Sequence, residues 1–302
     1  MLFHAKTITQ YHAHRGLPPP AHPLLSVAAF EDMHLPSHRP VETLTNDFYL
    51  IGLKRQSGVR MRFGRQEFDF DAGLMFFLPP GQAYTIEVEE GAETRGWLLA
   101  IHPDFLWNTP LADLPRRYDY FGYSLQEALH LSAAEESVIA GIVRTIGQEY
   151  RTPIDAFSQS LVVAQLGVML TYAERFYHRQ FLTRRRAGHE ILSRLAEVLE
   201  RYLHEDHLAT HGLPTVQQVA RDLYLSPNYL SDLLRVLTGK STQEHIHQRL
   251  INRAKRSLTA TDTPVTEIAY QLGFRHPQSF SKLFRARTGT SPSAFRKIIT
   301  PD

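Results

Sequence analysis

The 302-residue sequence contains no cysteine. This absence excludes disulfide bonds, cysteine–zinc sites, thiol catalysis and iron–sulfur clusters. No apolar run approaches the roughly 20 residues that a membrane-spanning helix needs, and residues 1–16 hold no apolar core long enough for a signal peptide. We therefore expect a soluble, cytoplasmic protein that does not contact a membrane.

Positive charge is concentrated in one stretch of the chain. The formal net charge of the whole sequence is +2, whereas residues 240–297 hold eleven Lys or Arg against three Asp or Glu, a local net charge of +8. Such a basic block favours a polyanionic partner such as DNA. A solvated surface without a partner is the alternative. The length fits two domains of roughly 150 residues each.

Residues 215–239 have the pattern of two short helices joined by a tight turn. Thr215 and Gln218 form a capping box for the first helix, Ser226 and Pro227 open the second, and Gly239 ends it. The apolar positions of each helix share one face: Val216, Val219, Ala220 and Leu223 in the first, and Leu230, Leu233, Leu234 and Leu237 in the second. The pattern predicts a helix-turn-helix.

The same unit occurs again about fifty residues later. Thr263 and Pro264 are the expected cap and first-turn proline. Val265, Ile268, Ala269 and Leu272 repeat the first apolar face at an offset of 49, whereas Phe280, Phe284 and Gly289 repeat Leu230, Leu234 and Gly239 at an offset of 50. The change of offset predicts an internal duplication with one extra residue in the second turn.

A single helix is predicted between the two units, over Thr242–Ala260. Ser241 and Glu244 form its capping box. At 1.5 Å per residue this helix is roughly 26 Å long. It can therefore hold two recognition helices about one DNA turn, roughly 34 Å, apart.

An ordered set of residues runs through the second unit: Ile268, Ala269, Gly273, Phe274, Phe280, Phe284, Gly289, Pro292, Phe295 and Arg296. This set resembles the signature of the AraC/XylS family of bacterial transcription regulators, in which the position of Phe295 is usually Tyr. The resemblance covers about residues 190–300. It implies that the exposed face of each second helix enters a major groove of double-stranded promoter DNA.

The resemblance assigns base contacts to both recognition helices. The first offers Asn228, Tyr229, Ser231, Asp232 and Arg235, and the second offers Arg275, His276, Gln278, Ser279, Ser281 and Lys282. Asn or Gln can pair with adenine and Lys with guanine. Asp232 either accepts from a cytosine amino group or pairs with Arg235 three residues later.

A second set of basic residues is expected to bind DNA phosphates or to form internal ion pairs. The set is Arg249, Arg253, Lys255, Arg285, Arg287, Arg296 and Lys297. A buried structural role in the connecting helix is an alternative for Arg253.

Residues 27–105 predict short strands separated by turns such as the one at Pro79, Pro80 and Gly81. The expected strands are Phe48–Lys54, Val59–Phe63, Gln66–Phe70, Leu74–Leu78, Tyr84–Val88 and Arg95–Ile101. Strands of this number and spacing suggest a sandwich or a small barrel. Residues 68–84 resemble the cupin-like arm of the same regulator family, which implies a barrel around a small-molecule effector. The sequence assigns no effector-binding residues.

The sequence does not offer the metal ligands of a cupin enzyme, an HxH pair with a carboxylate and a further His. His12 and His14 have the HxH spacing but precede the strands, and Pro36 disfavours a helix that would bring His34 and His38 together. We therefore expect no catalytic residues, no metal and no cofactor, and a protein that is not an enzyme. A cupin-type enzyme with an accessory DNA-binding domain is the alternative.

Residues 133–177 predict two helices, the first capped by Ser132 and Glu135 and the second beginning at Pro153. The resemblance implies that this pair forms a homodimer, and a pair that only covers the barrel is the alternative. The predicted fold is α+β. It has a cupin-like effector-binding and dimerisation domain over residues 1–178, a linker over residues 179–188, and an all-α double helix-turn-helix domain over residues 189–302.

The expected function is a sequence-specific transcription regulator that responds to a small-molecule effector, with RNA polymerase as a further expected partner. An N-terminal domain that serves only protein–protein assembly is the alternative.

Overall fold

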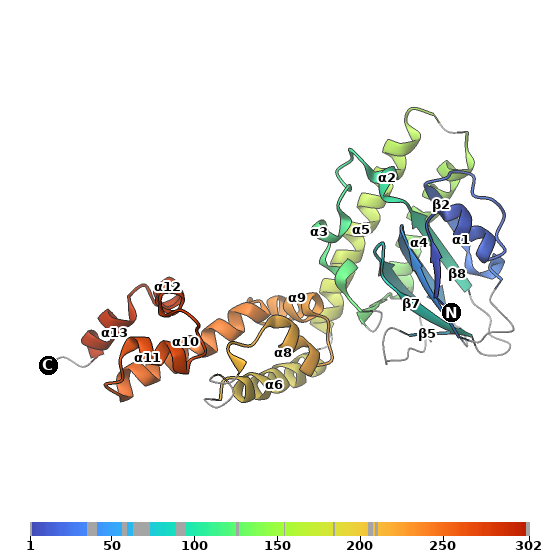
Figure 1. Cartoon of the computed structure of the whole chain (residues 1–302). Helices are drawn as coiled ribbons and strands as arrows, with labels where there is room; N and C mark the ends of the chain where they lie inside the picture. The colour runs from blue at the N-terminus through green and yellow to red at the C-terminus, as the bar shows by residue number, and fades with distance from the viewer. Residues whose placement is uncertain are drawn as a thin grey trace. The chain divides into compact units, whose positions relative to one another are not determined.

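The computed structural model describes residues 2–34, 41–55, 59–62, 73–88, 95–124, 127–153, 155–183, 185–204, 208 and 211–299. The chain divides into two compact units, Met1–Gln180 and Phe181–Asp302 (Figure 1). The predicted linker is helical where the structure describes it, since α5 (Ser158–Thr183) is followed by α6 (Arg185–Tyr202). The domain limits drawn from the sequence stay a prediction. None of the helices in the described residues is long and apolar enough to cross a membrane.

The first unit contains two β-sheets. One has the strand order β1 (Leu2–Ala5), β3 (Val41–Asn46), β7 (Tyr84–Val88), β5 (Val59–Arg62); the other has the order β2 (Leu25–Ala29), β8 (Arg95–Ile101), β4 (Tyr49–Arg55), β6 (Leu74–Leu78), β9 (Leu129–His130). All neighbours are antiparallel except β1 and β3. Within the described ranges no strand pair joins the sheets, so the predicted barrel is not closed there.

Most of the predicted strands are present. Three strands have the predicted bounds: β6 (Leu74–Leu78), β7 (Tyr84–Val88) and β8 (Arg95–Ile101). Strand β4 begins one residue later than expected. The expected strand Gln66–Phe70 lies outside the described residues. The sequence analysis did not predict β1, β3 or α1 (Ile8–His14).

The core of this unit lies between the sheets. Leu50 and Leu98 come from the five-stranded sheet, Leu44 and Ile86 from the four-stranded one, and all four are buried in one cluster. Side chains alternate between the faces of a strand, so these positions point inward while their neighbours point outward. Helix α1 adds Ile8 to the same cluster and is capped by Thr7, whose hydroxyl accepts from the Gln10 backbone N–H.

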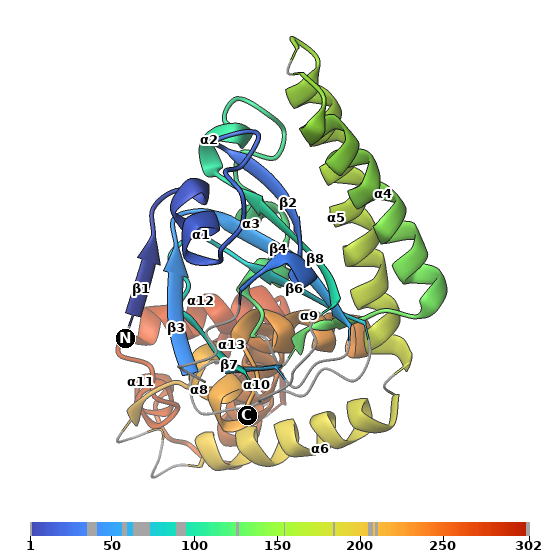
Figure 2. The ribbon, with the colours of Figure 1, turned by 90° about the vertical axis from the view of Figure 1, so that its right-hand side faces the viewer.

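Helices α4 (Ala133–Arg151) and α5 form an antiparallel pair beside the sheets (Figure 2). The predicted Ser132–Glu135 capping box is present, and α4 packs against β2. The prediction that the second helix begins at Pro153 is wrong. The Asp155 carboxylate accepts hydrogen bonds from the backbone N–H groups of Phe157 and Ser158, and this turn delays the helix start to Ser158. Short helices α2 (Pro103–Leu106) and α3 (Leu114–Arg117) precede the pair.

The second unit is entirely helical in its described part. After α6 it contains α8 (Val216–Asp222), α9 (Pro227–Thr238), α10 (Thr242–Ala260), α11 (Val265–Gln271), α12 (Pro277–Thr288) and α13 (Pro292–Ile299). Helix α10 has the predicted bounds and capping box. It contributes Ile246 and Leu250 to one core, and Ile251, Ala254 and Leu258 to another. Figure 1 shows α10 running from the α8–α9 pair to the α11–α12 pair.

Candidate nucleic-acid interface

The first helix-turn-helix consists of α8 and α9. Thr215 and Gln218 form the predicted capping box, and Ala220 is fully buried where the two helices approach. The turn contains Tyr224 in the left-handed region, at a φ of 60°. The Ser226 hydroxyl accepts from the Tyr229 backbone N–H at 3.3 Å and so caps α9. These contacts fix the angle at which α9 leaves the turn.

The second helix-turn-helix consists of α11 and α12. Five residues separate these helices, 272–276, against four in the first motif, 223–226, which confirms the predicted extra residue. The predicted cap at Thr263 is wrong: the N-cap residue is Pro264, and it makes no side-chain cap hydrogen bond. Gly273 and Gly289 both have a φ of 80°, at the turn and after α12.

The predicted base contacts of the second motif gather at the start of α12. Arg275, His276, Gln278, Ser279 and Lys282 are exposed, and Ser281 is half-buried. The opposite face of the helix carries Phe280 and Phe284, which are 1% and 0% exposed. Because burial of this face fixes the rotation of α12, the polar residues form one exposed surface.

Several predicted base contacts of the first motif are engaged within the second unit. Asn228 is exposed, but the Ser231 hydroxyl lies 3.0 Å from the Thr242 hydroxyl. Arg235 Nη1 donates to Asp232 Oδ1 at 2.6 Å. The structure therefore contains the ion pair that was one of the two interpretations of Asp232.

Tyr229 lies away from the exposed face of α9. Its side chain is 5% exposed, and its ring meets the Phe181 ring edge-on at 5.0 Å. The sequence analysis did not foresee this burial, because Phe181 lies far from α9 in the sequence.

The predicted phosphate contacts fall into two groups. Arg253 Nη1 donates to the Leu203 carbonyl at 2.6 Å, and Arg296 Nη2 donates to the Thr263 carbonyl at 2.6 Å. These two guanidinium groups therefore act as internal supports. The other five lie at or near the surface. Arg249 pairs with Glu200 at 3.3 Å, and Arg287 pairs with Glu244 at 3.8 Å. Lys255 Nζ lies 5.6 Å from the centroid of the Phe295 ring, and the side chains of Arg285 and Lys297 are exposed.

Glu244 helps to orient the interface. A hydrogen bond from the Ser241 backbone N–H, together with one from its hydroxyl, lowers the pKa of this carboxyl, and nearby Arg287 acts in the same direction. An ionised Glu244 caps α10 and pairs with α12 at once. It therefore ties the connecting helix to the second recognition helix.

Comparison with known proteins identifies both units. The sequence profile of a helix-turn-helix domain matches residues 219–298, and that of an AraC-binding-like domain matches residues 22–173, half of the chain. The chain belongs to the AraC family. Most of the residues on which the resemblance rested lie in the second motif and its core. They are Ile268, Ala269, Gly273, Phe274, Phe280, Phe284 and Gly289.

Individual AraC-family relatives align with only part of the chain. The Escherichia coli protein named uncharacterized HTH-type transcriptional regulator YijO is 27% identical over 168 residues, 56% of each chain. The E. coli arabinose operon regulatory protein is 36% identical over 91 residues, 30% of this chain and 31% of its own. The chain therefore spans about half, or less, of the length of these relatives.

A solved DNA-binding domain is also similar to part of this chain. The crystal structure of the DNA-binding domain of AdpA with a target DNA is 32% identical, covers 34% of this chain and 90% of that chain, and has a TM-score of 0.30.

The histidines considered as metal ligands make other contacts. His12 lies 2.6 Å from the Pro18 carbonyl and 2.7 Å from the Ser26 hydroxyl, and His14 lies 2.5 Å from Glu42. His38 is outside the described residues. In the part of the chain that the structure describes, no group of three or more His, Asp or Glu is arranged to hold a metal ion.

Proposed function

We propose that this AraC-family protein is a sequence-specific transcription regulator that binds promoter DNA through both helix-turn-helix motifs. The observation that carries the proposal is the exposed face of α12. Arg275, Gln278 and Lys282 lie on it beside Arg285, opposite the buried Phe280. Side chains of these types can read base edges, and nearby cations hold the phosphates.

The two motifs contribute unequally to recognition. In the first motif, Asn228 is exposed, whereas the Asp232–Arg235 pair and the Ser231–Thr242 hydrogen bond engage three of the other predicted base contacts. The second motif supplies Gln278 and Lys282, together with most of the positive charge. The 19-residue helix α10 joins the two motifs. Such a protein binds a site that spans two successive major grooves.

Selection of bound DNA from a random library tests this function. We expect enrichment of one site with two conserved blocks about one helical turn, roughly 10 base pairs, apart. Lys282→Ala should weaken binding and relax the base preference in one block, measured by fluorescence anisotropy, whereas Lys6→Ala, at an exposed lysine of the first unit, should leave both unchanged. Failure to enrich any such site would refute the proposal, and an inert Lys282→Ala would refute the assigned face.

We also propose that the protein is a homodimer in the cytoplasm, held together by the outer face of α5. Leu161 and Val168 on this helix are 52% and 48% exposed, and Phe157, directly before its first residue, is 69% exposed. Their spacings place the three side chains on one face. Leu166 and Leu170 on the inner face are fully buried. The same helix can therefore cover the sheets and pair with a second copy, so the two interpretations of the helix pair are compatible.

The first unit is proposed to bind a small-molecule effector and to have no catalytic role. An effector changes DNA binding only by the difference in its affinity for two conformations. Measuring DNA affinity with and without a ligand therefore tests the effector response separately from DNA binding itself. Contact with RNA polymerase stays a prediction.

A further inference from the structure

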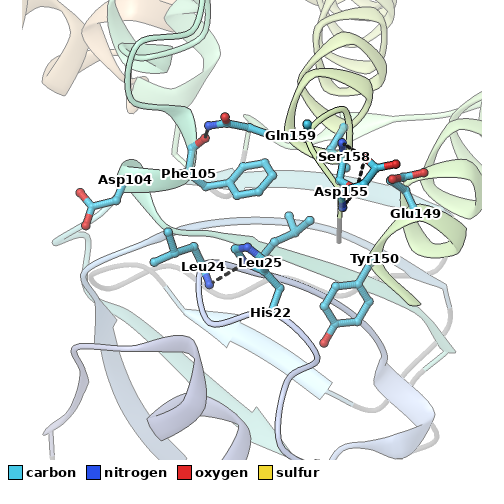
Figure 3. Close-up of a pocket in the computed structure, with 12 residues that line it drawn as sticks. His22, Leu24, Leu25, Asp104, Phe105, Glu149, Tyr150, Asp155, Ser158 and Gln159 are labelled. Atoms are coloured by element: carbon cyan, nitrogen blue, oxygen red, sulfur yellow. Dashed lines mark hydrogen bonds between the residues drawn. The ribbon is translucent and has the colours of Figure 1, made fainter. Parts of the chain in front are cut away.

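A cavity of about 360 Å³ lies in the first unit between the helix pair and the start of β2. Figure 3 shows the residues that line it: His22 and Leu25 come from the approach to β2 and its first residue, Phe105 from α2, Glu149 from the end of α4, and Ser158 from the start of α5. The volume is in the range of sites that hold small organic molecules. Four separate elements of the unit meet around it.

The inner wall of the cavity is apolar. Leu25, Phe105 and Val162 are 2%, 6% and 3% exposed. His22 meets Phe105 edge-on, with ring centroids 5.4 Å apart, and its Nδ1 accepts from the Leu24 backbone N–H at 3.0 Å. Burial lowers the pKa of His22. The imidazole is therefore neutral near pH 7 and carries its proton on Nε2.

The ionisable groups of the wall are acidic. Asp104, Glu149 and Asp155 line the cavity, and none of its twelve described lining residues is Lys or Arg. In Figure 3, Glu149 and Asp155 lie on the same side, while the Asp104 carboxylate points away. The hydrogen bond from the Phe157 backbone N–H, with those from Ser158, lowers the pKa of Asp155. This carboxylate is charged at neutral pH.

Two uncharged polar side chains, Gln159 and Tyr150, are also among the lining residues. The side chain of Gln159 donates from Nε2 to the Phe105 carbonyl at 2.7 Å, which leaves its amide oxygen as an acceptor. The Tyr150 hydroxyl accepts from the Ala21 backbone N–H at 2.7 Å. A ligand in the cavity meets these side chains together with the apolar groups and the Glu149 and Asp155 carboxylates.

We propose that this cavity binds a small amphipathic organic cation, a primary amine or guanidine attached to an aromatic or short alkyl group. The proposal deepens the proposed effector response and rests on it only for the regulatory consequence. The apolar group contacts Phe105, Leu25 and Val162, while the cation donates to Glu149 and Asp155 through charge-assisted hydrogen bonds. An anion of the same shape is repelled by the same carboxylates.

Binding at this place would act on the helix pair. The ligand bridges the end of α4 and the start of α5 to β2 and α2. Phe157 and Leu161, in the proposed dimer face, lie next to the lining residue Ser158 and to Val162 in the sequence. A bound cation would therefore favour one position of the start of α5 and, with it, one arrangement of the dimer.

Isothermal titration calorimetry on the full chain tests the cavity with three probes that share one ring. We expect phenethylamine to bind at least about tenfold more tightly than 2-phenylethanol, a difference of about 1.4 kcal/mol, and phenylacetate to give no binding. Glu149→Gln should weaken amine binding by a similar factor. The matched variant Glu174→Gln, at an exposed carboxylate of α5 outside the cavity, should leave it unchanged.

Equal affinity for the amine and the alcohol, an unchanged affinity in Glu149→Gln, or no amine binding at millimolar concentration would overturn the assignment. DNA affinity is then measured with and without phenethylamine. If the amine binds and DNA affinity does not change, the cavity assignment stands and the effector role fails. If no DNA site can be selected, the proposed function fails while calorimetry still decides the cavity.

Discussion

Gly273, in the turn of the second motif, provides a sharp test of how this unit is held together. Its φ of 80° is unfavourable for any residue with a Cβ, at a cost of about 1–2 kcal/mol. A Cβ at this position would also lie 3.1 Å from the Gly212 carbonyl carbon and 3.2 Å from the Leu208 carbonyl oxygen. Backbone atoms cannot move aside as a flexible side chain can. Overpacking of this kind costs about 1–3 kcal/mol more, so we expect Gly273→Ala to destabilise the second unit by about 2–5 kcal/mol.

Gly289 is the matched control, because its φ is also 80° but a Cβ there would meet no atom within 4 Å. Gly289→Ala should therefore show only the conformational cost, about 1–2 kcal/mol. Urea unfolding followed by circular dichroism at 222 nm measures both variants. The only tryptophans, Trp97 and Trp107, lie in the first unit, so their fluorescence transition should stay in place. Equal losses in the two variants would refute the close approach at Gly273.

Four further predictions concern both units. Gln278→Ala should weaken DNA binding by about 1–3 kcal/mol at particular base positions, whereas Arg285→Ala should weaken it evenly and reduce the salt dependence by about one unit of slope, both measured by anisotropy. Arg296→Met should destabilise the second unit by about 2 kcal/mol in the same urea experiment, because two carbonyl groups lose a charged donor; no shift would contradict its structural role. Burial lowers the pKa of Lys54 to about 7. The unfolded chain, with an ordinary lysine pKa near 10.4, therefore binds more protons between about pH 7 and 10. Stability of the first unit should rise with pH across this window, and Lys54→Met should remove the rise in the tryptophan transition. Leu161→Asp should convert the proposed dimer to a monomer in sedimentation velocity; an unchanged sedimentation coefficient would place the dimer contact elsewhere.

Local patterns explain why the second unit was predicted in such detail. The capping boxes at Thr215 and Ser241 involve residues three apart, and the apolar faces repeat every three or four residues, so both are visible in the sequence. The duplication doubled the evidence for each element. In the first unit, β1 has only four residues, which is too short a run for a periodic pattern in the sequence to predict it. Its pairing with β3, about forty residues away, is a tertiary contact.

The interface was predicted less completely than the helices. Helical spacing placed Tyr229 near the start of a recognition helix, but the ring of Phe181 covers it. The concentration of Lys and Arg in residues 240–297 suggested that Arg253 and Arg296 contact DNA, but the guanidinium groups of both donate to backbone carbonyls of other segments. Such contacts depend on which distant atoms the fold brings within about 3 Å, and no local pattern contains that information.

The sequence by itself determined the absence of thiol chemistry, the duplicated helix-turn-helix with its 49 and 50 offsets, the bounds of the connecting helix, and the concentration of positive charge. Covalent composition and side-chain spacing along the chain are sufficient for each of these. Only the tertiary structure decided which of the basic side chains are exposed, that the Phe181 ring covers Tyr229, and that four separate elements surround a cavity with an acidic wall. These features arise where residues far apart in sequence meet, because burial and hydrogen bonding depend on distance in space.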